Sequence, residues 1–418
     1  MIRWCGWETR RSRRWPNMLE SFSNGSTDPC SLPRLILVSR ALTRPVLAEN
    51  RVVSSSQKFE RGFARSCTQY ANVTVLNVIG AGARLSGGEC VDGIQFYTVG
   101  LLHLLSAIRR MGRGPSTSPV ITTGYDPALM SVLVACRNTG IPAFSFIYDT
   151  HKISMQGRPL YRRAAIDAYF SIGLCIARLL NGWIVLNDRF IVASRLPTPP
   201  HLKTRIGIDA SALQGGSPVS SPVKIRRRPI FLYSGTLNAD NGTDILISAV
   251  RQMPGYDFEL HVYGDGPQAH IVQSAADVDL RIKFFGKIAN DEVVRKQHSA
   301  DILIHLRDPG SPSSMYSYPS KLIEYLCSQR PVVSNLLPTI EDVEPYLTPI
   351  DDFSSASIQK TLSGIIDGFA PARENPSLAV HLYRNQGWAK VSAEIMGFVG
   401  VRTHSSLVAS SFAPRIRA

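Results

Sequence analysis

Short apolar runs alternate with longer amphipathic stretches in the first half of the chain, and this alternation is its main structural signal. The runs at residues 35–38, 73–78, 120–122, 143–147 and 183–186 are typical of strands buried on both faces. The stretches that indicate helices are residues 101–111, 127–137 and 160–180. A short strand is also predicted at residues 205–208. Strands and helices in this order predict a parallel sheet covered by helices.

The alternation restarts after a glycine-, serine- and proline-rich segment at residues 215–228, which we expect to be a flexible linker. Strands are predicted at residues 230–233, 258–263, 282–285, 302–306 and 331–334, with a helix at 243–250. The expected class is α/β, with two doubly wound domains facing each other across a cleft. The predicted segments are an irregular extension (1–30), a first domain (31–214), the linker, a second domain (229–375), a final helix (376–400) around Trp388 and a tail (401–418).

The composition is typical of a soluble protein with anionic partners. The 418 residues include 46 lysines and arginines against 32 acidic residues, a formal net charge of +14. This excess suits anionic partners such as nucleotides, phospholipid headgroups or nucleic acid, and the alternative, which charge alone favours, is a basic surface without a partner. The sequence has two basic clusters, Lys224 with Arg226, Arg227 and Arg228, and Arg158 with Arg162 and Arg163. Neither has the interleaved aromatic residues of a nucleic-acid platform, so no nucleic-acid partner is expected. No apolar run is long enough for a membrane helix, and the scattered cysteines and histidines predict a reducing, cytoplasmic compartment and no metal site.

The stretch at residues 317–326 is the most informative for chemistry. Read as a helix, it places Ser317, Ser320, Lys321 and Glu324 on one face and Pro319, Leu322, Ile323 and Leu326 on the other. The amino end of a helix offers free N–H groups and a positive dipole to an anion. That dipole repels Lys321, and a bound diphosphate would remove the conflict. Glu324 could accept hydrogen bonds from ribose hydroxyls. The alternative is a surface helix with an ordinary lysine–glutamate pair.

Three further loops carry candidate residues. The loop after the first strand of the second domain contains Gly235 and Thr236, where glycine lets a backbone approach a ligand closely. Gly264 lies in a Gly-Asp-Gly-Pro turn. Asp149 and His151 follow the strand that ends at residue 147, where they could serve polar or catalytic chemistry in the cleft. For the first loop the alternative is a tight strand-to-helix connection, and for the second it is a turn without a ligand. For Asp149 and His151 the alternative is a structural pair.

Several different short motifs follow one another along the second domain. They lie at residues 233–237, 241–242, 262–267, 285–287, 300–302, 319–326 and 331–333. In this order they resemble the donor-binding half of the retaining glycosyltransferases of family four, the glycosyl transferases group 1, which have the GT-B fold. Residues 205–209 and the turn with Asp149 and His151 resemble the first domain of that family more faintly. The helix around Trp388 resembles the one that crosses back to the first domain.

The resemblance implies a nucleotide-diphosphate sugar in the cleft as co-substrate, with no cofactor and no metal. It implies that Ser320 and Lys321 hold the diphosphate, with Leu322 beside them, and that Glu324 holds the ribose. Lys287 and Ile288 would border the base, and residues Ser317 to Pro319 would face the donor sugar. Retention without a metal is expected because the helix end and basic side chains stabilise the departing phosphate charge.

The chain departs from the family pattern in both domains, and in the first domain Ser39-Arg40-Ala41 stands where the family has a glycine pair. Thr236 and Asn241 stand where the family commonly has arginine and lysine, and Tyr316 stands where it has a glutamate. The leading hypothesis is transfer of a sugar to a glycan or lipid-linked acceptor in cell-envelope or exopolysaccharide biosynthesis, in the cytoplasm or at the inner face of the membrane. Peripheral contact could come from the helix at residues 164–180, unless that helix packs in the core. The alternatives are a catalytically inactive GT-B subunit and a sugar-nucleotide epimerase.

Overall fold

The computed structural model describes residues 32–48, 55–112, 118–152, 158–193, 197–208, 227–368, 382 and 386–401. The predicted extension at residues 1–30, most of the linker at 215–228, and the tail from residue 402 lie outside the described residues. From Pro33 onward the chain forms one compact unit. This unit contains two β-sheets, and we call the parts around them the first lobe (residues 33–208) and the second lobe (residues 227–368).

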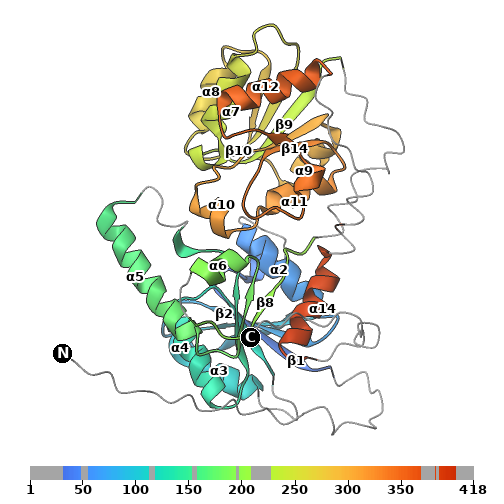
Figure 1. Ribbon diagram of the computed structural model, residues 1–418. Helices are drawn as coiled ribbons and strands as arrows, with labels where there is room; N and C mark the ends of the chain where they lie inside the picture. The colour runs from blue at the N-terminus through green and yellow to red at the C-terminus, as the bar shows by residue number, and fades with distance from the viewer. Residues whose placement is uncertain are drawn as a thin grey trace, which may run out of the picture. The chain divides into compact units, whose positions relative to one another are not determined.

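The first lobe is built on an eight-stranded sheet, visible in Figure 1. Its strand order is β3-β4-β2-β1-β5-β6-β7-β8, and all neighbours are parallel except β3 and β4. The strands are β1 (Arg34–Ser39), β2 (Asn72–Val78), β3 (Ser86–Val91), β4 (Ile94–Val99), β5 (Val120–Thr123), β6 (Ala143–Ile147), β7 (Gly182–Val185) and β8 (His201–Lys203). The helices are α1 (Arg44–Ala48), α2 (Ser55–Cys67), α3 (Leu101–Gly112), α4 (Pro127–Asn138), α5 (Leu160–Ala177) and α6 (Asp188–Ala193).

Helices cover both faces of this sheet because its strands are apolar on both sides. In β1, Leu35 and Leu37 belong to one buried cluster, while Ile36 and Val38 belong to another. Successive side chains of a strand point to opposite faces, so the two clusters lie on opposite sides of the sheet. The first cluster includes Phe59 of α2, and the second includes residues of α3 and α4. The predicted doubly wound sheet is confirmed.

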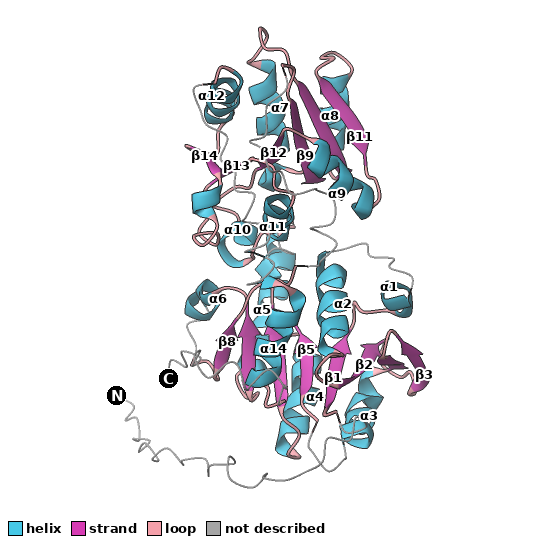
Figure 2. Ribbon diagram, turned by 90° about the vertical axis from the view of Figure 1, so that its right-hand side faces the viewer, coloured by secondary structure: helices cyan, strands magenta, loops and turns pink. Residues whose placement is uncertain are grey.

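The second lobe has a six-stranded, all-parallel sheet with the order β11-β10-β9-β12-β13-β14, which can be followed in Figure 2. The strands are β9 (Ile230–Thr236), β10 (Glu259–Asp265), β11 (Ile282–Gly286), β12 (Ile302–His305), β13 (Val332–Asn335) and β14 (Thr348–Ile350). The helices are α7 (Thr243–Arg251), α8 (Ala269–Ala276), α9 (Asn290–Ser299), α10 (Pro312–Tyr316), α11 (Ser320–Cys327) and α12 (Ser355–Ile366), with the short 3₁₀ helices η3 (Ala239–Asn241) and η4 (Glu344–Tyr346).

The prediction of a strand at residues 205–208 is wrong. The last strand of the first sheet is β8, at His201–Lys203, and it begins just after Pro200, whose carbonyl accepts a hydrogen bond from Trp183 N at 3.0 Å. The chain then leaves the sheet, and Ile208 forms only an isolated bridge with Gly387. The alternation did not predict β3, β4, β14 or α2. The β3 strand is an exposed, glycine-containing edge, so it lacks an apolar run.

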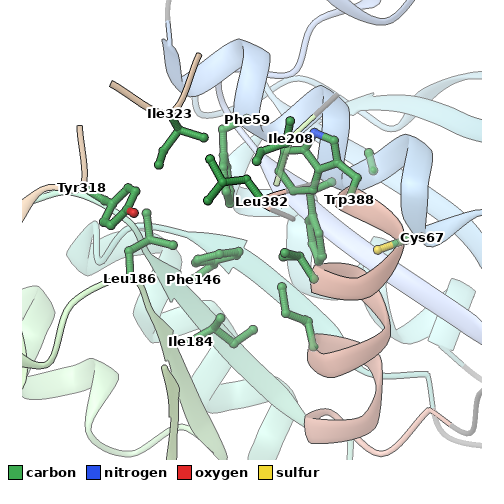
Figure 3. Packing of buried hydrophobic residues seen from close by; sticks show 14 of the residues in the cluster. Phe59, Cys67, Phe146, Ile184, Leu186, Ile208, Tyr318, Ile323, Leu382 and Trp388 are labelled. Carbon is green, nitrogen blue, oxygen red and sulfur yellow. The ribbon is translucent and has the colours of Figure 1, made fainter. Parts of the chain in front are cut away.

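The end of the described chain returns to the first lobe. The helix α14 (Trp388–Phe398) packs against α2, where the Trp388 ring lies 5.2 Å from the Phe59 ring and 6.5 Å from the Phe63 ring, measured between centroids. Tyr70 Oη also donates a hydrogen bond to the Ala389 carbonyl at 2.8 Å. Figure 3 shows Trp388 among these buried side chains, beside Phe59. The described part of the predicted final helix is confirmed as helical from Trp388 onward.

Replacing Gly207 with alanine is expected to lower the free energy of unfolding by about 1–3 kcal/mol, because a β-carbon there would overpack the core. It would lie 2.1 Å from Trp388 Cδ2, and that ring is wedged against α2. Urea unfolding of both proteins measures the difference. Gly82→Ala is the matched control, because a β-carbon at Gly82 meets no atom within 4 Å. An unfolding free energy for Gly207→Ala equal to that of the control would contradict this account of the contact.

Candidate functional site

Each sheet has one point where the order of its strands reverses. In the first sheet this point lies between β1 and β5, and in the second sheet between β9 and β12. Ligands of doubly wound sheets bind outside the carboxyl ends of the strands at such a point. The residues that end or follow the flanking strands are Ser39 and Thr123 in the first lobe and Thr236 and Arg307 in the second.

Side chains from the two lobes meet near the carboxyl ends of their strands. Ser317 Oγ, in the second lobe, donates a hydrogen bond to the carboxylate of Asp149, which follows β6 in the first lobe. Lys58 Nζ of α2 lies 3.0 Å from Glu324 Oε2 of α11. Asn187 Nδ2 donates to the Met315 carbonyl at 3.3 Å. The structure therefore joins two groups of predicted site residues, one from each lobe, although they are far apart in sequence.

Glu324 is the most strongly interacting carboxylate among these residues. Its side chain is only 10% exposed, and its Oε1 lies 2.7 Å from Lys321 Nζ while Oε2 faces Lys58. Gln297 Nε2 also donates to Oε1 at 2.9 Å. Burial by itself would raise the pKa of Glu324, but the charges of Lys321 and Lys58 and these hydrogen bonds outweigh it and lower the pKa to about 2. The side chain is thus a carboxylate at any ordinary pH.

A buried polar network fixes the orientation of α11 behind Glu324. Tyr325 Oη accepts a hydrogen bond from Ser234 N at 2.7 Å, which attaches α11 to β9. Gln297 Nε2 lies 3.2 Å from Ser234 Oγ and bonds to Glu324 as well, which attaches both to α9. These hydrogen bonds come from β9 and α9, so two other elements hold α11 and its Glu324 side chain in place.

The amino end of α11 has the features that an anion site needs. Pro319 is its N-cap residue, and no side chain caps the helix. The amide of Leu322 donates to the Pro319 carbonyl at 3.0 Å, and the Leu322 side chain is fully buried. Leu322 therefore serves the core, and the first turn offers the amides of Ser320 and Lys321 instead. The Lys321 side chain is 30% exposed, and its ammonium group lies 2.7 Å from Glu324 Oε1.

Asp149 is exposed as a residue, but neighbouring groups shield its carboxylate from part of the solvent. Burial raises the pKa of Asp149, while the hydrogen bonds from Ser317 and from Thr150 N and the charge of Arg307 oppose this shift. Lys152, three residues further on, places its ammonium group 5.3 Å from the centroid of the Tyr316 ring. Tyr316, the position where the resembled family has a glutamate, therefore also lies against the first lobe.

His151 is engaged on both ring nitrogens. Its Nδ1 lies 2.7 Å from Tyr125 Oη, and its Nε2 lies 2.8 Å from Asp167 Oδ1 of α5. The ring also stacks on Phe170 at 5.3 Å between centroids. This arrangement connects the loop after β6 to α5, as in the structural alternative, and the catalytic role of His151 stays a prediction.

The glycine loops of the second lobe pack on one another. A β-carbon at Gly264, where φ is +144°, would lie 1.9 Å from the Gly235 carbonyl oxygen, so close approach of β10 to β9 requires glycine there. Thr236 is exposed, and its carbonyl accepts hydrogen bonds from Tyr233 Oη at 3.2 Å and Asn241 Nδ2 at 2.9 Å. Asn241 therefore shapes this loop where the resembled family has a lysine.

Lys287 and Ile288 follow β11 at the edge of the second sheet. Lys287 is exposed, while Ile288 is partly buried against the large apolar cluster that contains residues of both lobes. Next to them, the Phe285 ring stacks on the Tyr263 ring at 4.7 Å and 8°. Their predicted contact with the base of a nucleotide stays a prediction.

Sequence reasoning missed Glu60, a buried carboxylate at the first reversal point. Glu60 of α2 is 4% exposed, and it accepts hydrogen bonds from Ser39 Oγ, from Thr123 Oγ1 at 2.9 Å and from Tyr148 Oη at 3.2 Å. Burial raises its pKa, and the three hydroxyl groups oppose the shift. Ser39 and Thr123 are the last residues of the two strands that flank the reversal point. Their positions at these strand ends could have indicated the site from the sequence.

Within the described ranges, no group of three or more histidine, cysteine, aspartate or glutamate side chains is arranged to hold a metal ion. The same part of the chain contains no helix with the length and apolar character that a membrane crossing requires.

Comparison with known proteins identifies the architecture. Residues 228–363, most of the second lobe, match the family model of the glycosyl transferases group 1. No curated protein matched the chain significantly. Solved structures match over nearly the whole chain, and they establish that the chain has the GT-B fold. Together the family match and the fold support a GT-B glycosyltransferase, as the sequence predicted, and membership of family four stays a prediction.

Three of these structures have 10–13% sequence identity to this chain. Sucrose-phosphate synthase from Thermosynechococcus elongatus has a TM-score of 0.63 at 13% identity, with 88% of this chain and 98% of that chain covered. HepE of Anabaena, in complex with UDP and glucose, has a TM-score of 0.61 at 13% identity, with 88% and 99% covered. A UDP-forming α,α-trehalose-phosphate synthase from Burkholderia xenovorans, in complex with glucose-6-phosphate, has a TM-score of 0.62 at 10% identity, with 88% and 99% covered.

Proposed function

We propose that the protein transfers a sugar from a nucleotide-diphosphate donor to a glycan or lipid-linked acceptor, with retention of the anomeric configuration. The observation that carries this proposal is the Lys321–Glu324 pair at the start of α11, inside the segment that matches the glycosyl transferases group 1. Glu324 of this pair is 10% exposed and also contacts Lys58 of the first lobe, so the pair lies where the two lobes meet.

The donor would bind through its phosphates at the amino end of α11. The uncapped amides of Ser320 and Lys321 and the Lys321 ammonium group would stabilise the charge of the diphosphate. Glu324 would accept hydrogen bonds from the ribose hydroxyls, because its low pKa keeps it ionised. Lys287 and Ile288 would lie beside the base. The HepE structures are described as complexes with UDP and UDP-glucose, so UDP is the first nucleotide to test.

The acceptor would react from the side of the first lobe. In the transfer, the bond between the anomeric carbon of the sugar and the phosphate oxygen breaks, and a bond from that carbon to the acceptor oxygen forms on the same face. The acceptor proton moves to the departing phosphate. Asp149, attached to the donor side through Ser317, would orient the acceptor hydroxyl. No step of this scheme uses a metal or a cofactor.

Two measurements test this function. UDP and GDP are titrated while thermal unfolding is followed, and binding of one of them should raise the unfolding temperature. Release of free nucleoside diphosphate from its sugar conjugate should then require an added acceptor. Absence of any shift at saturating nucleotide would favour the inactive-subunit alternative, which the departures at Thr236, Asn241 and Tyr316 suggest. Conversion of the donor sugar without release of nucleotide would favour the epimerase.

For a lipid-linked acceptor, we propose that α5 contacts an anionic membrane surface in the cytoplasm. The second half of this helix packs against the core through Phe170, Leu174 and Ile176, but residues 160–165 of its first half are exposed. Its first turn exposes Leu160 and Tyr161 beside Arg162 and Arg163. Apolar and basic side chains together favour an interfacial position. The double variant Arg162→Glu/Arg163→Glu should lose co-sedimentation with phosphatidylglycerol vesicles, and wild-type levels of sedimentation for the variant would refute the contact.

A further inference from the structure

Arg307 is a cation that the described chain leaves without a partner. It is the second residue after β12, and its backbone is fixed by Asn335, whose Oδ1 accepts from Arg307 N at 3.0 Å and whose Nδ2 donates to the Arg307 carbonyl at 2.8 Å. Its Nη1 is buried and makes no hydrogen bond to any described residue. No described carboxylate lies within ion-pairing distance of the guanidinium group either.

Such a position is unfavourable for a free guanidinium group. Burial lowers the pKa of Arg307 from its ordinary value, although the more distant charges of Asp149 and Asp240 oppose the shift. Arg307 as a residue is half-buried, and a buried polar atom such as its Nη1 nearly always has a hydrogen-bond partner, since an unpaired and partly desolvated charge is costly. A ligand that brings negative charge would remove both costs at once.

Arg307 stands where the fold places ligands. It lies at the carboxyl end of β12, on one side of the reversal point, and the loop with Gly235 and Thr236 lies on the other side, after β9. The two loops touch, because Asp308 N donates to the Asp240 carbonyl at 2.6 Å. Its charge also acts on Asp149 of the first lobe. Arg307 is therefore close to both groups of predicted site residues.

We propose that Arg307 binds the phosphate groups of the nucleotide-diphosphate donor and supplies the positive charge that the loop with Thr236 and Asn241 lacks. This rests on the proposed function, because it assumes such a donor. A guanidinium group suits the task, since it can donate two parallel hydrogen bonds to a phosphate.

The test compares wild type, Arg307→Gln and Arg307→Lys by isothermal titration with UDP or GDP, whichever the wild type binds. We expect Arg307→Gln to raise the dissociation constant by roughly 10- to 100-fold, the usual effect of losing hydrogen bonds to a charged group. Arg307→Lys, which keeps the charge, should lose less. Arg295→Gln is the matched control, because Arg295 makes an exposed i,i+4 ion pair with Asp291 on α9.

Thermal unfolding without nucleotide separates binding from a structural role. If the charge of Arg307 serves ligand binding and not the stability of the fold, Arg307→Gln should unfold at the wild-type temperature or above it. A lower unfolding temperature for Arg307→Gln would show that the fold itself needs the charge, and this would overturn the proposal. Wild-type affinity in Arg307→Gln would also overturn it, with the proposed function intact. A wild type that binds neither nucleotide would refute the proposed function and this proposal together.

Discussion

Replacing Asp149 with asparagine is expected to lower the turnover number of sugar transfer by about 10²-fold, the order of loss when the orientation of a reacting group is impaired. Asparagine keeps the shape of the side chain and an oxygen that can accept the hydrogen bonds from Ser317 Oγ and Thr150 N. It removes the negative charge next to the reacting groups. Donor affinity should change little, because Glu324 and Lys321 hold the nucleotide in this scheme. Steady-state kinetics with the acceptor that supports nucleotide release measures both quantities.

The pH profile gives the second readout for Asp149. Because partial desolvation raises the pKa of this carboxyl group, wild-type activity should fall on the acid side at a higher pH than a fully solvated aspartate would produce. Asp149→Asn should lack this acid limb. Asp188→Asn is a suitable control, since Asp188 pairs with Lys203 on the surface. Turnover in Asp149→Asn equal to that of the control would show that Asp149 only connects the lobes.

Replacing Glu324 with glutamine is expected to weaken nucleoside diphosphate binding by roughly 10- to 100-fold, because the hydrogen bonds from ribose would no longer reach a charged acceptor. It should also lower the free energy of unfolding at neutral pH by roughly 2–3 kcal/mol, since Lys58 and Lys321 lose their partner. Isothermal titration and urea unfolding measure the two effects separately. Unchanged affinity in a folded Glu324→Gln protein would contradict the assignment of Glu324 to the ribose.

The stability effect of Glu324 has a defined pH dependence. Its pKa is lowered from 4.5 to about 2 in the folded protein. The carboxylate therefore stabilises the fold fully above about pH 4.5, and this contribution disappears as the pH falls toward 2. The difference in unfolding free energy between wild type and Glu324→Gln should be largest near neutral pH and shrink over that range. Glu89→Gln, which breaks an exposed ion pair with Arg44, should show little difference at any pH.

Local patterns predicted the elements that have a strong apolar signal. The strands around residues 35, 75, 145 and 303 lie where the sequence indicated, because each is buried on both faces and so reads as a continuous apolar run. The β3 strand and α2 were not predicted, because neither has a continuous apolar run. The β3 strand is exposed and contains two glycines, and α2 contributes only a few large apolar side chains, such as Phe59 and Phe63, to the core.

The candidate site likewise contains residues that local spacing predicted and residues that it did not. Spacing alone placed Lys321 and Glu324 on one face of a helix, and the structure shows the i,i+3 ion pair that the sequence offered as the alternative to a diphosphate site. The spacing did not predict Lys58, which lies 266 positions away from Glu324. Arg307 could have been found, because it directly follows a predicted strand at the edge where ligands bind. It was missed because no motif contains it.

The sequence by itself determined the two alternating α/β halves and the helix face that carries Lys321 and Glu324, since both depend on side-chain periodicity within one element. Only the tertiary structure decided which groups those residues meet. The bond from Ser317 to Asp149, the Lys58–Glu324 ion pair and the unpartnered position of Arg307 all arise where strand ends from distant parts of the chain come together. Such contacts depend on strand order, and strand order leaves no periodic trace in the sequence.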